Sequence, residues 1–88
     1  MNIDKKQFVR AKIHTIIAPG EALAMLRSLQ NLSQSELAEL TGISQPNISA
    51  LENSRINMGR ETAITLAYAL KVHPSVLLFP DFDISQVA

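Results

Sequence analysis

The chain has 88 residues, 47% of them hydrophobic, and carries no net charge at neutral pH. A chain of this length forms one small domain, and the absence of cysteine excludes disulfides and cysteine-based zinc sites. No apolar run is long enough to cross a membrane and no signal-peptide pattern is present, so we expect a cytoplasmic protein with no membrane contact.

The first patterned segment, residues 8–17, alternates its side chains with a period of two and is rich in β-branched residues. This pattern predicts a β-strand, and a lone strand is unstable unless it pairs. We therefore expect residues 1–18 to form an N-terminal extended arm. It packs on its own domain or adds to another chain, either a second protomer or a partner protein. The side chains that would make these contacts are Phe8, Val9, Ile13, Ile16 and Ile17.

Helical periodicity and capping signals then predict an all-α domain over residues 19–80. Ala18-Pro19-Gly20 is interpreted as a break before its first helix. Residues 81–88 are predicted to be an acidic, mobile tail. The five helices are expected at about residues 21–30, 34–40, 45–53, 60–70 and 74–79.

Residues 32–53 carry two helix starts separated by a tight turn. Ser33 is followed three residues later by a carboxylate, which is typical of a capping box. Ser44 precedes a helix with Pro46 in its first turn, where the missing N–H costs nothing. Gly42 supplies a left-handed stop between them. This arrangement indicates a helix-turn-helix whose bend is filled by five apolar side chains: Leu37, Leu40, Ile43, Ile48 and Leu51.

Residues 21–79 resemble the DNA-binding domains of the lambda-repressor/Cro type, also called the Xre family. The resemblance implies a five-helix lambda-repressor-like fold that binds double-stranded DNA. The sequence departs from the family at Ser54, where a glycine is usual, and this predicts a positive φ for a non-glycine residue. The segments that carry the likeness are Leu32-Ser33-Gln34, Glu36-Leu37-Ala38, Thr41-Gly42-Ile43-Ser44, residues 48–53 and residues 66–72.

The predicted recognition helix, residues 45–53, presents small and amide side chains, the chemistry that reads base edges. Gln45 and Asn47 are expected to contact bases, with adenine preferred, and Gln34 to hold a phosphate beside the groove. The alternative for each is an ordinary solvated polar residue. The DNA-binding candidates are Ser33, Gln34, Ser44, Gln45, Pro46, Asn47, Ser49, Ala50, Asn53, Arg55, Asn57 and Arg60.

The resemblance also implies a partly buried ion pair between Arg27 and Glu52 with a role in the scaffold. His14 and His73 are isolated from other ligand residues, so no metal site is expected. No catalytic motif is present, and we expect neither an enzyme nor a cofactor.

Zero net charge predicts modest affinity per protomer, and hence a homodimer on an inverted-repeat operator. The short chain with its added arm resembles HigA-type antitoxins of type II toxin–antitoxin pairs. That resemblance implies a repressor of its own operon that binds a RelE/HigB-like toxin. Two alternatives remain: a stand-alone phage-like or chromosomal Xre regulator without a toxin, and a protein-interaction module that no longer binds DNA.

Overall fold

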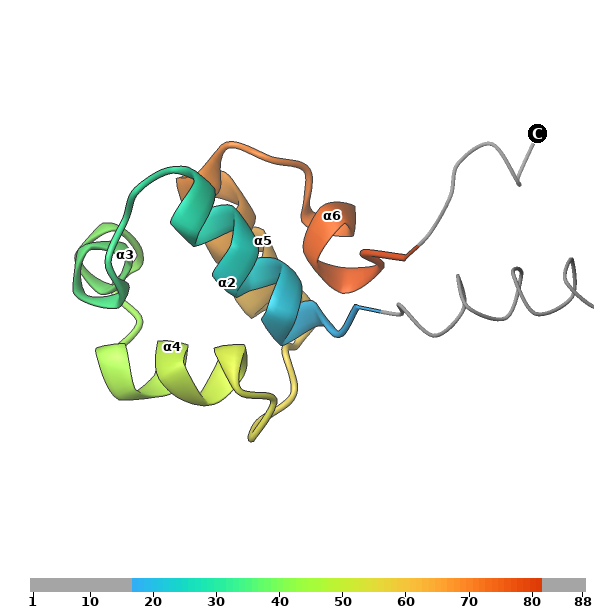
Figure 1. Cartoon of the computed structure of the whole chain (residues 1–88), viewed down its shortest axis with the longest axis horizontal. Helices are drawn as coiled ribbons and strands as arrows, with labels where there is room; N and C mark the ends of the chain where they lie inside the picture. The colour runs from blue at the N-terminus through green and yellow to red at the C-terminus, as the bar shows by residue number, and fades with distance from the viewer. Residues whose placement is uncertain (1–16, 82–88) are drawn as a thin grey trace, which may run out of the picture.

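The computed structural model describes residues 17–81, and all regular structure in this part of the chain is helical. The result confirms the predicted all-α domain. Most of the predicted arm, including Phe8, Val9, Ile13 and Ile16, lies outside the described residues, as do residues 82–88 of the predicted tail. The helices are α2 (Pro19–Leu29), α3 (Gln34–Thr41), α4 (Gln45–Glu52), α5 (Arg60–Leu70) and α6 (Pro74–Leu78) (Figure 1).

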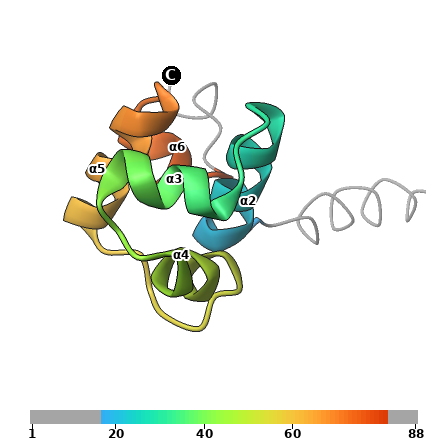
Figure 2. The same cartoon turned by 90° about the vertical axis from the view of Figure 1, so that its left-hand side faces the viewer.

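The helices α3 and α4 occupy one side of the domain and cross steeply. Figure 1 looks along α3 and shows α4 lengthwise, whereas Figure 2 shows the reverse. Helix α4 packs against α2 and α3, and α6 packs against α2 and α5. One face of α4 is consequently left at the lower edge of the domain, where no other helix of residues 17–81 covers it (Figures 1 and 2).

Apolar side chains from all five helices meet in one core. On α5, burial follows the predicted i, i+3, i+4, i+7 spacing of Ala63, Leu66, Ala67 and Leu70. Burying each large aliphatic side chain stabilises the fold by about 1.5–3 kcal/mol, and this burial fixes the two helices of the turn to the scaffold. The largest fully buried side chains are Leu23, Leu37, Ile48, Leu66, Leu70 and Leu77.

The predicted break before the first helix is wrong, because Pro19 and Gly20 form the first turn of α2. Proline suits this position, since the N–H that it lacks would have no intrahelical partner. Glycine is needed for packing: a Cβ on Gly20 would lie 2.1 Å from the carbonyl oxygen of Leu51. The Pro-Gly pair therefore starts a helix and lets it approach the end of α4 closely.

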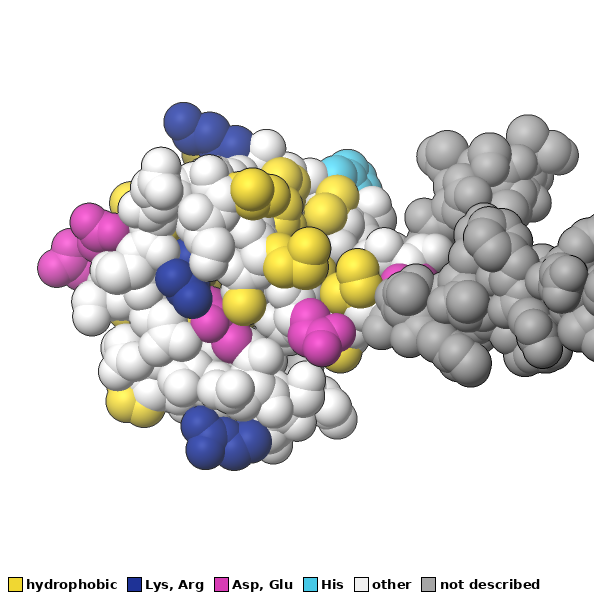
Figure 3. Space-filling view, viewed as in Figure 1, with side chains coloured by type: hydrophobic (Ala, Val, Ile, Leu, Met, Phe, Trp, Pro, Cys, Tyr) yellow, Lys and Arg dark blue, Asp and Glu magenta, His cyan; other side chains and the backbone are white. Residues whose placement is uncertain are grey.

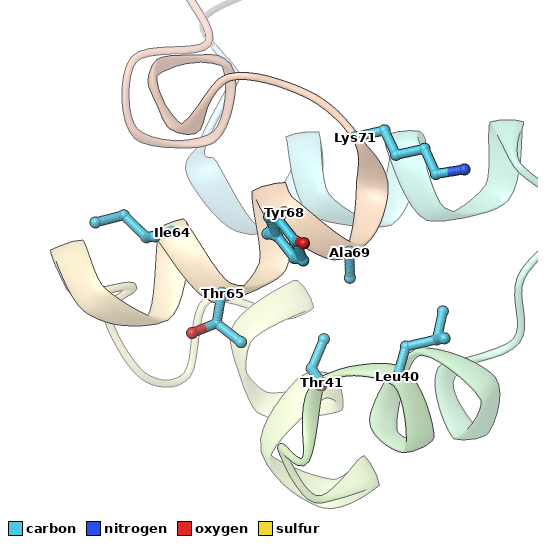
Figure 4. Close-up of a pocket in the computed structure, with 7 residues that line it drawn as sticks. All are labelled: Leu40, Thr41, Ile64, Thr65, Tyr68, Ala69 and Lys71. Carbon is cyan, nitrogen blue, oxygen red and sulfur yellow. The ribbon is translucent and has the colours of Figure 1, made fainter.

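Leu40, predicted to fill the bend, is 61% exposed. On α3 the inward position after Leu37 falls to Thr41, whose hydroxyl donates to the Leu37 carbonyl at 2.8 Å. Leu40 instead lines a groove of about 490 Å³ between α3 and α5, where Figure 4 shows it facing the end of α5 that carries Ala69 and Lys71. Both Leu37 and Leu40 have the spacing of a buried helical face, but the short helix α3 buries only Leu37 of the two.

The two ends of the described chain are joined. The backbone N–H of Ile17 donates to both carboxylate oxygens of Asp81, at 2.9 and 2.8 Å. Ile17, which the sequence analysis assigns to the arm, is half-buried against the hydrophobic core. Within residues 17–81, none of the helices has the length and apolarity needed to span a membrane.

Candidate nucleic-acid interface

The start of α3 is fixed by the predicted capping box. Ser33 Oγ accepts a hydrogen bond from the Glu36 N–H at 2.9 Å, and Glu36 Oε1 accepts from the Ser33 N–H at 2.8 Å. Gly42 ends the helix with φ 81°, and its N–H donates to the Ala38 carbonyl at 2.8 Å. These local bonds satisfy helix ends that would otherwise lack partners, and they set the angle at which the chain enters α4.

The first turn of α4 projects its side chains into solvent. Ser44 Oγ accepts from the Asn47 N–H at 3.3 Å, and Pro46 lies in the first turn, both as predicted. Gln45, Pro46 and Asn47 are all exposed. Because the N-terminus of a helix carries a partial positive charge, this exposed end is a favourable neighbour for phosphate groups.

The predicted DNA-binding residues lie at the start of α3, along α4, in the loop after α4 and at the start of α5, and they differ in exposure. Gln34, Ser49 and Ala50 are half-buried, and the other nine candidates are exposed. The lower edge in Figure 3, formed by α4 and the loop after it, shows mainly backbone and side chains that are neither hydrophobic nor charged, with a basic group at its rim. Asn53 is partly occupied inside the helix, because its Nδ2 donates to the Ser49 carbonyl at 2.9 Å.

The implied ion pair between Arg27 and Glu52 is confirmed. Arg27 Nε donates to Glu52 Oε2 at 2.6 Å, and Nη2 donates to Oε1 at 3.0 Å. The two side chains are 17% and 6% exposed. Burial raises the pKa of Glu52, but hydrogen bonds from Arg27 and Gln34, together with the charge of Arg27, outweigh burial and leave that pKa below its ordinary value. The hydrogen bond to Glu52 likewise raises the pKa of Arg27.

Sequence reasoning missed that this ion pair continues into the interface through Gln34. Gln34 Nε2 donates to Glu52 Oε1 at 2.9 Å, and Gln45 Nε2 donates to Gln34 Oε1 at 2.6 Å. The available signal was positional: Gln34 and Gln45 are the first residues of two helices that pack together. A connected chain of hydrogen bonds thus runs from the scaffold to the exposed start of α4.

The loop after α4 carries the predicted departure from the family pattern. Ser54 has φ 58°, which confirms the expected left-handed backbone at a non-glycine residue. The conformation is held by backbone bonds, from the Ser54 N–H to the Leu51 carbonyl at 3.1 Å and from the Arg55 N–H to the Ala50 carbonyl at 2.8 Å. The loop is therefore shaped by α4 itself and carries Arg55 and Asn57 beside it.

Within residues 17–81, no three metal-ligating side chains lie close enough together to hold a metal ion. The chemistry of the α4 surface in this part of the chain is that of amides, hydroxyls, backbone N–H groups and two arginines, Arg55 and Arg60. Such groups bind by hydrogen bonding to base edges and phosphates.

A helix-turn-helix family profile matches residues 23–77. No curated protein matches the chain. Among solved structures, the c2 repressor of P22 in complex with a synthetic operator is 29% identical, with a TM-score of 0.69 over 74% of this chain and 98% of that chain.

The restriction-modification controller protein C.AhdI from Aeromonas hydrophila is 30% identical, with a TM-score of 0.66 over 72% of this chain and 96% of that one. The solution structure of the DNA-binding domain of the P22 c2 repressor is 28% identical, with a TM-score of 0.70 over 78% of this chain and 91% of that one. The described domain thus has the fold of these regulators.

Proposed function

Because this chain belongs to the Xre-like helix-turn-helix family, we propose that it is a sequence-specific transcriptional repressor that binds DNA through α4. The observation that carries the proposal is the exposed first turn of α4, where Gln45 is held by a hydrogen bond from its amide to Gln34. A side chain fixed in this way loses less conformational entropy when it meets a base edge. The structural likeness to the P22 c2 repressor bound to an operator supports the same role.

In this proposal α4 lies in the major groove, where an amide can distinguish base pairs by their donor and acceptor patterns. The N-terminus of α3 and the exposed Ser33 lie beside the phosphate backbone. Gln34 can still offer its second amide N–H to a phosphate, since its other polar positions bind Glu52 and Gln45. Contacts to phosphates fix the orientation of the helix, and Gln45 and Asn47 supply sequence preference.

The charge of the interface supports a homodimer. Among the described residues near α4, Arg27 is neutralised by Glu52, which leaves Arg55 and Arg60 as the cations of this surface. Few phosphate neutralisations mean weak non-specific binding per protomer. Two protomers related by a two-fold axis would read half-sites about one helical turn apart, roughly 34 Å, on an inverted-repeat operator.

The test is selection of binding sites from a random duplex pool with the full chain, followed by footprinting of the selected duplex. The proposal predicts an inverted repeat with two protected half-sites, and loss of binding with rising salt. Selection of no preferred sequence would contradict DNA readout and favour a protein-interaction module. Saturating protection of one isolated half-site would contradict the dimer.

A second candidate is an antitoxin that represses its own operon and binds a RelE/HigB-like toxin. One observation favours it: the P22 c2 and C.AhdI chains are covered almost completely by about three quarters of this chain. The remaining quarter is additional, and the apolar segment 8–16 lies outside the matched residues 23–77. The likeness to C.AhdI supports instead a stand-alone regulator without a toxin.

A further inference from the structure

A series of hydrogen bonds connects Arg27, Glu52, Gln34 and Gln45. Glu52 determines which group donates and which accepts in this series. A carboxylate can only accept hydrogen bonds, whereas an amide can present either its oxygen or its NH2 group to a neighbour. Both oxygens of Glu52 accept from Arg27, and Oε1 also accepts from Gln34. The NH2 group of Gln34 must therefore face Glu52, and its oxygen must face away.

This constraint passes from Gln34 to Gln45. Gln45 and Glu52 are the first and last residues of α4, two helical turns or about 10 Å apart along one face. The side chain of Gln34, from the start of α3, lies between them. Since Gln34 presents its oxygen, Gln45 must turn an N–H toward it, and the two atoms lie 2.6 Å apart, within hydrogen-bond distance.

Among residues 17–81, the hydrogen bond to Gln34 is the one that the Gln45 side chain makes, so a second N–H and the carbonyl oxygen remain in the plane of its amide. That pair matches the N7 acceptor and N6–H donor that adenine shows in the major groove. If the hydrogen bonds ran in the opposite direction, Gln34 would donate to the oxygen of Gln45, and both N–H groups of Gln45 would be free to face the base. Two donors match guanine, which shows the acceptors O6 and N7.

We propose that Glu52 is a positioning residue for base recognition: as an acceptor-only group it sets the direction of the chain through Gln34 and makes Gln45 specific for adenine over guanine. This inference rests on the proposed DNA-binding function. It assigns to the ion pair, besides its place in the scaffold, a role in choosing the base.

The deciding variant is Glu52→Gln, which keeps the shape of the side chain but can donate. Arg27 still requires an acceptor, so the new amide can turn its oxygen toward Arg27 and its NH2 group toward Gln34. The hydrogen bonds from this residue through Gln34 to Gln45 would then run in the opposite direction. The readout is the ratio of Kd values for duplexes with G·C and A·T at the base pair read by Gln45. That pair is the position in the selected site whose preference Gln45→Ala abolishes.

The wild-type chain should prefer A·T by about 5- to 150-fold, the range expected for one bidentate contact. In Glu52→Gln this preference should fall to within a few-fold of unity. Gln34→Met removes the hydrogen bonds that link Glu52 to Gln45 but leaves the Arg27–Glu52 ion pair intact. It should reduce the A·T preference in the same way. Adding Glu52→Gln to Gln34→Met should change the ratio no further, because Glu52 acts through Gln34.

A core variant separates positioning from stability. Leu77→Val should lower the melting temperature and yet keep the full A·T preference, because Leu77 is buried on α6 away from the chain. An A·T preference retained in either Glu52→Gln or Gln34→Met would overturn the inference. If Glu52→Gln fails to fold by circular dichroism, Gln34→Met still tests the link through which Glu52 acts, and an A·T preference retained in that variant would overturn the inference. A wild-type chain that selects no site would instead contradict the proposed function.

Discussion

Glu52 places a carboxylate at the last residue of α4, although the carbonyl groups at a helix C-terminus disfavour negative charge there. Arg27 offsets this cost with two hydrogen bonds, and the pKa of Glu52 falls below its ordinary value despite burial. The pairing of these two residues was predictable from the family resemblance. The bridge through Gln34 was not, because sequence spacing does not give the direction in which an amide side chain turns.

The lowered pKa of Glu52 makes a prediction about stability and pH. A carboxylate whose pKa is depressed by folding contributes stability above its unfolded value, about 4.3, and loses it as the pH falls through the folded value. At pH 7, Glu52→Gln should therefore destabilise the domain by roughly 1.5–3 kcal/mol, the worth of hydrogen bonds to a charged group. The measurement is urea unfolding of both chains from pH 7 to pH 3.

The difference in unfolding free energy between the two chains should shrink below about pH 4, because protonation removes the same charge from the wild-type chain. Glu39→Gln is a useful control, since Glu39 is exposed on α3 and is not part of the ion pair. A wild-type advantage over Glu52→Gln that stays constant down to pH 3 would show that the carboxylate charge does not stabilise the fold.

Among the elements, the helices were predictable and their packing only in part. Caps and periodicity placed each helix to within about two residues, because these signals are local to the chain. The sequence misled where one signal has two physical meanings. Pro19-Gly20 resembles a turn, but Gly20 serves the close approach of α2 to the Leu51 carbonyl. Leu40 has helical spacing yet faces a groove, because Thr41 takes the inward position after Leu37.

At the scale of the whole molecule, the domain forms a closed unit from Ile17 to Asp81, whose ends are joined by two hydrogen bonds. The core, the ion pair and the exposed start of α4 all lie within this unit. Ile17 packs on the core of its own domain, one of the two alternatives predicted for the arm. The sequence could not choose between them, because β-branched alternation is the same whether a residue packs on its own core or on another chain.

Removal of residues 1–16 tests whether this part of the predicted arm binds another protein chain. The cut keeps Ile17 and its bond to Asp81, so the helices should stay folded by circular dichroism. If the protein is an antitoxin whose arm binds a partner, the shortened chain should lose dimerisation, or should no longer co-purify with a toxin encoded by the neighbouring gene. Ile13→Pro in the full chain should do the same, since proline removes a donor from strand pairing. Normal dimerisation and toxin capture by both variants would remove the support for an antitoxin.

The most direct test of the central claim is the binding of Gln45→Ala to its selected operator and to a random duplex at one salt concentration. Gln45 is exposed at the start of α4 and makes no core contact, so the variant should fold normally. We predict a loss of about 1–3 kcal/mol on the operator and almost none on the random duplex. Equal losses on both duplexes would contradict base readout by α4.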